Sequence, residues 1–285
     1  MQPASEFQNT GRLGASLRAL GLALLSLSAL ASAVAAPAAG QQAAACKATA
    51  YLTFDTGSQS QAEFIAQTLK RHAIRASFFM ASEKTVNGDF SLDPSWAAYW
   101  KARVAEGHVF GSHTFDHVYV QRDLPDGSIV VKPQFGENAG KRLTWTPQQY
   151  CEELRRVDRR FMELTGRRLD PLWRAPGGRL TPNLKAAGAT CGYAHVAWAD
   201  AGYSGDELSS EKVSNATLLK GALDRLKDGD IFIAHLGIWS RRDPWAPAVL
   251  EPLISGLEAR GFCFATLREH PDYRARFQHA ENGRH

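Results

Sequence analysis

Two histidines four positions apart are the strongest chemical signal in the sequence. His113 and His117 stand in the segment GHVFGSHTFDH, residues 107–117. This spacing places two imidazoles on one face of a helical turn, where both can bind one metal ion. The alternative is one surface histidine and one histidine bonded to the backbone. The pair therefore predicts a metal site and leaves that alternative open.

Three further polar residues follow apolar runs that are typical of buried strands. Asp55 ends the run in TFDTG, Arg174 precedes APGG, and His235 follows IFIA. An aspartate and a histidine can serve as general base and general acid, and an arginine can keep the carboxylate ionised. Taken singly, Asp55 is also consistent with a turn residue, Arg174 with an exposed residue at a turn, and His235 with a core histidine.

Alternating strand and helix patterns can bring these residues together. Strand, helix and strand in quick succession is typical of a parallel sheet, and a parallel α/β barrel carries its active site at the carboxyl ends of the strands. Two polar stretches, residues 84–100 and 118–146, interrupt the alternation, and we expect the longer one to be a functional or mobile loop. Strands are predicted at residues 49–54, 75–80, 108–111, 172–174, 193–198, 231–234 and 262–266, and helices at 61–72, 147–165 and 215–227.

Length and composition favour one catalytic domain. The chain has 285 residues, of which 44% are hydrophobic, and an α/β barrel of about 250 residues forms a single domain. Lys and Arg total 33 against 29 Asp and Glu, without a long basic run interleaved with aromatic residues. We therefore expect no nucleic-acid partner. We also expect a monomer.

The N-terminal residues are typical of a secretory signal. Arg12 and Arg18 precede an apolar run at residues 20–31, and Ala-Val-Ala at 33–35 offers a cleavage site. The run is too short to span a bilayer as a helix, so we expect a periplasmic or secreted protein without a membrane span after processing. An uncleaved anchor and lipidation at Cys46 are the alternatives. The expected parts are a signal peptide at 1–35, a flexible linker at 36–46, the catalytic domain at 47–275 and a C-terminal tail at 276–285.

Four cysteines follow the predicted cleavage site: Cys46, Cys151, Cys191 and Cys263. An oxidising compartment favours disulfides, and four cysteines allow three pairings. Cys46 opens the first predicted strand and Cys263 lies early in the last, and these strands are neighbours in a closed barrel. We therefore predict a Cys46–Cys263 disulfide, with four unpaired thiols as the alternative.

Taken in order, these segments resemble the polysaccharide deacetylase family, the NodB-like carbohydrate esterases. Residues 107–117 are similar to the family's histidine motif and residues 70–79, KRHAIRASFF, to its second strand. Arg174-x-Pro176 and Ile233-x-His235 are similar to its third and fifth motifs. The resemblance spans most of the mature chain. It implies a single-domain, distorted (β/α)7-type barrel with a divalent metal ion, zinc in the usual case, held by His113 and His117.

The resemblance also implies roles for the other candidate residues. The metal would lower the pKa of a water that attacks an acetamide carbonyl, and Asp55 would take the proton of that water. Arg174 would keep Asp55 ionised, and His235 would protonate the leaving amine. The resemblance further implies that the Gly177 N–H forms half of an oxyanion hole and that Ile233 forms the wall beside the acetyl methyl. It implies that Trp239 offers a surface on which a sugar ring stacks.

Two positions depart from the family pattern. Thr56 stands where the family has an aspartate that ligates the metal, and a neutral hydroxyl is a weaker ligand. We expect the ion still to bind the two histidines, with Asp55 or water completing the site and Thr56 acting through a water. In the fourth motif, Asp200 is a better candidate than Asp206 for pairing with His235.

These observations predict an exported, metal-assisted hydrolase that removes acetyl groups from N-acetylated, or O-acetylated, sugars of a cell-envelope or extracellular polysaccharide. Thr56 motivates a first alternative, a hydrolase of a non-sugar amide without the usual metal site. A non-catalytic carbohydrate-binding barrel is the second alternative.

Overall fold

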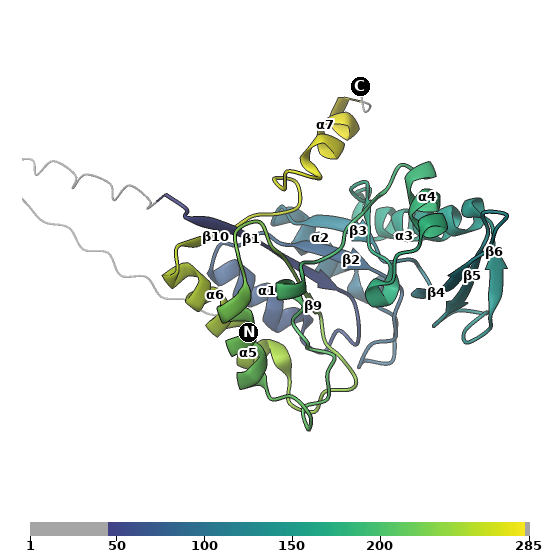
Figure 1. The fold of residues 1–285 in the computed structure, drawn as a ribbon. Coiled ribbons are helices and arrows are strands. Elements are labelled where there is room, and N and C mark those ends of the chain that lie inside the picture. The colour runs from purple at the N-terminus through teal and green to yellow at the C-terminus, as the bar shows by residue number, and fades with distance from the viewer. Residues whose placement is uncertain (1–44, 283–285) are drawn as a thin grey trace, which may run out of the picture. The chain divides into compact units, whose positions relative to one another are not determined.

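The structure is a computed structural model that describes residues 45–282 (Figure 1). The predicted signal peptide and residues 36–44 of the predicted linker lie outside this range. Within it, no helix combines the length and the apolar character needed to cross a bilayer. The last helix, α7 (Arg274–Asn282), crosses the boundary expected at residue 275.

A parallel sheet forms the centre of the fold. Its strands are β1 (Ala48–Asp55), β2 (Ser77–Met80), β3 (Val109–Ser112), β7 (Leu172–Trp173), β8 (Ala194–His195), β9 (Ile231–His235) and β10 (Phe262–Phe264). The order is β10-β1-β2-β3-β7-β8, with β9 also paired to β1.

Strand β1 pairs with three parallel strands, β2, β9 and β10. Its first residues pair with β10, and Tyr51 to Asp55 pair with β9. Beyond β8, Tyr203 forms a parallel bridge to Ile233 of β9, so the sheet curls back toward its other end. This curled parallel sheet, with helices between its strands, confirms the predicted distorted barrel (Figure 1).

Burial on both faces explains the continuous apolar runs of the central strands. Every residue of β2 and β3 is buried, as expected for parallel strands covered on both sides. The Phe78 ring lies between Phe54 and Phe110, with ring centroids 5.7 and 5.8 Å away. Helix α1 (Ala62–Arg71) buries Ile65 and Leu69, which share one face because they are four positions apart.

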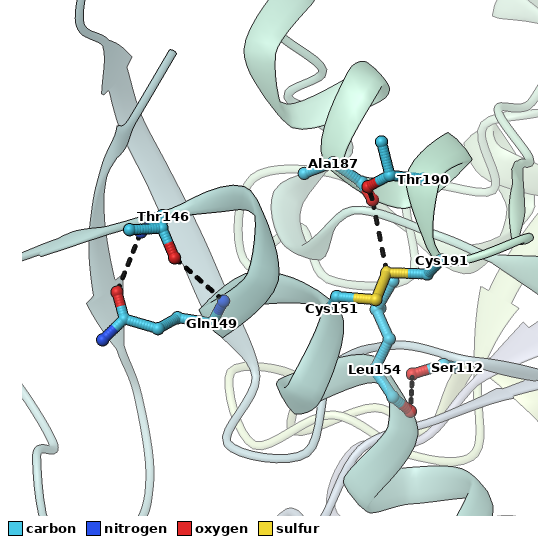
Figure 2. Close-up of a disulfide and its surroundings, with 8 residues drawn as sticks. All are labelled: Ser112, Thr146, Gln149, Cys151, Leu154, Ala187, Thr190 and Cys191. Carbon is cyan, nitrogen blue, oxygen red and sulfur yellow. Dashed lines mark hydrogen bonds between the residues drawn. A yellow bond between two sulfur atoms is a disulfide. The ribbon is translucent and has the colours of Figure 1, made fainter. Parts of the chain in front are cut away.

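Helix α3 (Pro147–Thr165) has the bounds that the sequence predicts. Thr146 and Gln149 form a reciprocal capping box at its N-terminus, and Gly166 ends it in a left-handed conformation (Figure 2). The other helices are α2 (Ala97–Ala105), α4 (Pro182–Thr190), α5 (Asn215–Arg225) and α6 (Glu251–Ala259), with short helical turns at Pro94–Trp96, Pro176–Gly178, Asp200–Gly202 and Ala246–Leu250.

The interruption at residues 118–146 is not the loop that the sequence predicts. It forms an antiparallel sheet of β4 (Val118–Asp123), β5 (Ile129–Pro133) and β6 (Leu143–Trp145). Val120, Ile129 and Val131 pack in one cluster with Tyr150 of α3. Their burial stabilises the small sheet, which lies beside α3 and α4 and away from α5 and α6 (Figure 1).

Both pairs of cysteines form disulfides. The predicted Cys46–Cys263 bond is confirmed, with the two Cα atoms 5.6 Å apart, and the alternative of four thiols is wrong. Cys151 of α3 bonds to Cys191, the residue after α4 (Figure 2). Near it, the Ser112 hydroxyl donates to the Leu154 carbonyl, 3.3 Å away, and so joins the end of β3 to α3.

Candidate active site

The candidate residues meet in one cleft at the carboxyl ends of the parallel strands. Of the predicted site residues, Asp55, His113, His117, Gly177, Ile233, His235 and Trp239 line this cleft. Arg174 is fully buried behind Asp55. Thr56 and Asp200 are not part of the lining.

Asp55 and Arg174 form a buried ion pair. The Arg174 Nη1 donates to Asp55 Oδ1 at 2.7 Å, and Nη2 donates to the Thr53 hydroxyl at 2.9 Å. The guanidinium also lies over the Phe79 ring, 4.2 Å from its centroid. Burial acts most strongly and raises the pKa of Asp55, but Arg174, together with His113 and His235, outweighs burial, so the pKa lies below its ordinary value. Asp55 is therefore an ionised carboxylate at neutral pH.

His113 is held as a neutral ring with one free nitrogen. Its Nδ1 lies 2.9 Å from the Arg174 carbonyl, which can only accept, so Nδ1 carries the proton. Its Nε2 is then unprotonated and lies 3.5 Å from Asp55 Oδ2. Burial is the main cause that lowers the pKa of His113 to about 3. The ring is thus prepared to act as a ligand.

His117 lies beside His113, although not on a helical turn as the spacing predicts. The chain turns sharply between β3 and β4, with positive φ angles at Thr114 (63°) and His117 (47°). The two imidazole centroids are nevertheless 4.9 Å apart. Within residues 45–282, the buried Nδ1 of His117 has no hydrogen-bond partner. The pairing of the histidines was predicted correctly and their local structure was not.

His235 is paired with Asp206, and the predicted pairing with Asp200 is wrong. The His235 Nδ1 lies 3.0 Å from Asp206 Oδ1, and the His235 N–H donates to Asp206 Oδ2 at 2.6 Å. Asp200 is exposed in a helical turn. After that turn, Tyr203 runs beside β9, which brings Asp206 to His235.

The Asp206 carboxylate makes His235 a proton donor. Burial acts to lower the pKa of His235, but the charge of Asp206 and its hydrogen bond outweigh burial and raise the pKa to about 10. Because Nδ1 faces Asp206, the remaining Nε2 is the ring nitrogen available to the cleft. His235 therefore carries a proton at neutral pH.

Strand register places Asp55 beside His235. Asp55 and His235 are directly paired residues of the neighbouring strands β1 and β9, so they emerge at the same end of the sheet. The loops that follow touch at Gly57, where an added Cβ would lie 2.3 Å from the Gly237 carbonyl oxygen. Glycine at position 57 therefore allows the two loops to approach.

The Thr56 side chain lies outside the cleft, although the sequence led us to expect it to act there through a water. Its side chain is buried, and its hydroxyl oxygen accepts the Ala81 N–H at 3.0 Å. The expectation that Thr56 orients a water in the site is unsupported, because the hydroxyl serves the backbone after β2 and does not line the cleft.

Two residues that sequence reasoning did not single out also line the cleft. Glu83 lies three residues after β2, with its Oε1 3.9 Å from His117 Nε2. Tyr119 of β4 contacts the His117 ring at 4.9 Å between centroids. Glu83 could have been found, because it follows a buried strand at the edge where the other polar residues gather. Tyr119 depends on the unpredicted sheet.

The cleft has walls suited to a small acyl group and a ring. Ile233 is buried, Gly177 adopts a left-handed φ of 66°, and Trp239 is 62% exposed at the rim. By contrast, Trp100 is buried and Trp96 packs against the core, so neither is available to a sugar.

The donor types fit a divalent cation. Two imidazoles and a carboxylate are ligands that zinc prefers, and the Asp55 Oδ2 to His113 Nε2 distance of 3.5 Å is close to the roughly 3.4 Å edge of a tetrahedral site. In the part of the chain that is described, no group of three or more His, Cys, Asp or Glu side chains already converges on one point.

Comparison with known proteins agrees with this geometry. The polysaccharide deacetylase family matches residues 42–196, just over half of the 285 residues. The chain belongs to the polysaccharide deacetylase family. The predicted family and the predicted enzyme class, a polysaccharide deacetylase, are confirmed.

This deacetylase is similar to two curated relatives. The chitooligosaccharide deacetylase of Azorhizobium caulinodans is 25% identical over 76% of the chain and 91% of the relative. The peptidoglycan-N-acetylmuramic acid deacetylase PdaA of Bacillus subtilis is 26% identical over 77% of the chain and 70% of the relative.

A solved structure supports the fold of the deacetylase. The Xyl-CE4 domain of a multidomain xylanase from the hindgut metagenome of Trinervitermes trinervoides superposes with a TM-score of 0.58 at 17% identity. The match covers 80% of the chain and 91% of that domain. The likeness agrees with the distorted barrel described above.

Proposed function

We propose that the protein is an exported, metal-assisted deacetylase of N-acetylated sugars in a cell-envelope or extracellular glycan. The observation that carries the proposal is the facing pair of an ionised Asp55 and a protonated His235 in one cleft. The names of the two curated relatives support an N-acetylated oligosaccharide or peptidoglycan as substrate.

Asp55 acts as the general base in this proposal. Its Oδ1 is bonded to Arg174, which leaves Oδ2 to accept a proton from a water in the cleft. The water oxygen attacks the acetamide carbonyl carbon, and the carbonyl oxygen gains negative charge. The buried guanidinium keeps Asp55 ionised before the reaction.

His235 acts as the general acid. Collapse of the tetrahedral species breaks the bond between the acyl carbon and nitrogen, and the leaving nitrogen needs a proton. His235 Nε2 donates it, and Asp206 stabilises the imidazolium until then. Acetate and a free amino sugar are the products.

The remaining groups position the acetyl group. His113 and His117 would hold a divalent ion, zinc by preference, which when bound lowers the pKa of a water and polarises the acetyl carbonyl. The Gly177 N–H would donate to the carbonyl oxygen. Ile233 would contact the methyl group, and Trp239 would stack on a sugar ring.

Export is part of the proposal and rests on the sequence. Residues 1–35 have the charge, apolar run and small-residue site of a secretory signal. The two disulfides support it, because such bonds persist in oxidising compartments.

Acetate release from a panel of glycans tests the proposed function. The panel holds N-acetylated chitooligosaccharides, peptidoglycan and an O-acetylated xylan, each with and without a chelator followed by zinc. We expect release from an N-acetylated member, loss of release with chelator, and recovery with zinc. Absence of acetate from every member would contradict the proposal.

Thr56 supports one second candidate, a hydrolase that works without the usual metal site. The Thr56 hydroxyl lies off the cleft and supplies no ligand charge. Activity that survives prolonged chelation, on a glycan or on a non-sugar acetamide, would favour this candidate.

A further inference from the structure

Glu83 is a buried carboxylate without an evident structural partner. Its side chain is 11% exposed and lines the cleft beside the two histidines. Within residues 45–282, its carboxylate oxygens take part in no hydrogen bond, and Oε1 lies 3.9 Å from His117 Nε2. These oxygens are not among the fully enclosed side-chain atoms of the described residues, so they face the cleft and can reach a cation there.

The distance to His117 favours a shared cation over a direct bond. A hydrogen bond between these atoms requires about 2.7–3.2 Å, whereas the separation is 3.9 Å. Two atoms that ligate one tetrahedral zinc ion at about 2.0–2.2 Å each lie roughly 3.3 to 3.6 Å apart. The Glu83–His117 separation is a few tenths of an ångström longer than that, so a small side-chain movement brings both atoms to ligand distance of one ion.

The second pair in the cleft has similar spacing. Asp55 Oδ2 and His113 Nε2 are 3.5 Å apart, and the two imidazole centroids are 4.9 Å apart. The His117 Nδ1 has no partner among the described residues, so a small rotation of this ring breaks no hydrogen bond. Such a rotation would let Glu83, His117 and the unprotonated Nε2 of His113 bind one ion. Asp55 Oδ2 then stays free to act as the base.

We propose that Glu83 is a metal ligand of this protein, together with His113 and His117, and supplies the carboxylate charge that Thr56 does not. The inference rests on the metal-assisted function proposed above and names a residue for it. If Glu83 is a ligand, removal of its charge lowers the metal affinity of the protein.

Zinc binding to the purified protein tests the proposal directly. Zn²⁺ affinity is measured by competition with a chromophoric chelator for the parent chain and for Glu83→Gln and Glu83→Ala. Since loss of groups that only orient ligands weakens metal binding by about 10–100-fold, we expect each variant to bind Zn²⁺ at least roughly 100-fold more weakly. Near-ultraviolet circular dichroism without metal checks that each variant folds.

Glu207→Gln is the matched control, because Glu207 is a second carboxylate in the same cleft. We expect its Zn²⁺ affinity to equal that of the parent. The absorption spectrum of bound Co²⁺ should change with Glu83→Gln and stay the same with Glu207→Gln.

Two results would overturn the inference in different ways. If the parent and both Glu83 variants bind Zn²⁺ equally, or if Glu207→Gln weakens binding as much, Glu83 is not a ligand and the metal-assisted function stands. If the parent chain binds no Zn²⁺, the metal role in the proposed function fails together with the inference.

Discussion

At the scale of single residues, two ion pairs hold the proposed base, Asp55, and the proposed acid, His235, in opposite charge states. Arg174 keeps Asp55 ionised inside the protein, and Asp206 keeps His235 protonated beside it. Burial acts against the charged form of each residue, and the ion-pair partner together with neighbouring charged groups outweighs burial. Proton transfer in the proposed reaction needs both states at the same pH.

The pH profile of kcat should depend on the contact between Asp206 and His235. The raised pKa of His235, about 10, keeps the acid protonated through neutral and mildly alkaline pH. In Asp206→Asn the charge that raises this pKa is gone, so His235 loses its proton at lower pH. We expect the alkaline limb of kcat against pH to move to lower pH.

Asp200→Asn is the control for this experiment, since Asp200 is exposed and, within residues 45–282, forms no hydrogen bond or ion pair with His235. Its pH profile should match that of the parent. An alkaline limb that stays in place in Asp206→Asn would contradict the role given to Asp206.

Sequence reasoning found most of the proposed catalytic groups but missed other residues of the cleft, among them Glu83 and Tyr119. Asp55, His113, Arg174 and His235 each follow an apolar strand, and this pattern is visible in the chain itself. Asp200 was predicted as the partner of His235 instead of Asp206, because the path of the chain after β8 depends on the Tyr203–Ile233 bridge. Such a long-range contact leaves no local pattern.

At the scale of elements, strand β3 positions the histidine pair through close packing. An added Cβ at Gly111 would lie 2.6 Å from the Phe79 ring and 2.9 Å from the Leu172 carbonyl oxygen. We expect Gly111→Ala to lower the free energy of unfolding by about 1–3 kcal/mol, the usual cost of overpacking a core. Denaturant unfolding followed by fluorescence measures this change.

Gly221→Ala is a matched substitution that we expect to raise the free energy of unfolding, whereas Gly111→Ala should lower it. Gly221 lies within α5, and the atoms nearest an added Cβ belong to the flexible Arg225 side chain, 3.3 Å away. Alanine there should raise the free energy of unfolding by about 0.5–1 kcal/mol. Equal effects of the two substitutions would contradict the packing described for β3.

Elements were predictable where local signals agreed. Helix α3 has a capping box, an amphipathic pattern and a terminal glycine, and its predicted bounds match the structure. The small β4–β5–β6 sheet was missed, because its strands stand in a stretch rich in polar residues and the side chains that bury them belong to α3 and α4. Strand β8 is shorter than the predicted strand at residues 193–198, because only two of its residues pair with β7.

At the scale of the whole molecule, a disulfide joins the first and last strands of the curled sheet. Cys46 and Cys263 are 217 positions apart, whereas Cys151 and Cys191 are 40 apart. This pairing was predictable because β1 and β10 are neighbours in the expected barrel. The second bond was not, since it depends on how α3 and α4 pack.

The two disulfides should differ in their contribution to stability. In the chain-entropy description, a bond that closes a longer loop restricts the unfolded chain more. We expect Cys46→Ser/Cys263→Ser to cost about 1.5 kcal/mol more in unfolding free energy than Cys151→Ser/Cys191→Ser. Urea unfolding of both double variants measures the difference, and a larger loss for the second would contradict it.

The central claim is that Asp55 is the base of an acetyl-releasing reaction. Its most direct test is the initial rate of acetate release from an N-acetylated oligosaccharide by the parent chain and by Asp55→Asn, with circular dichroism to check folding. The rate should fall by at least about 100-fold. A folded Asp55→Asn protein that releases acetate at the parent rate would contradict the account.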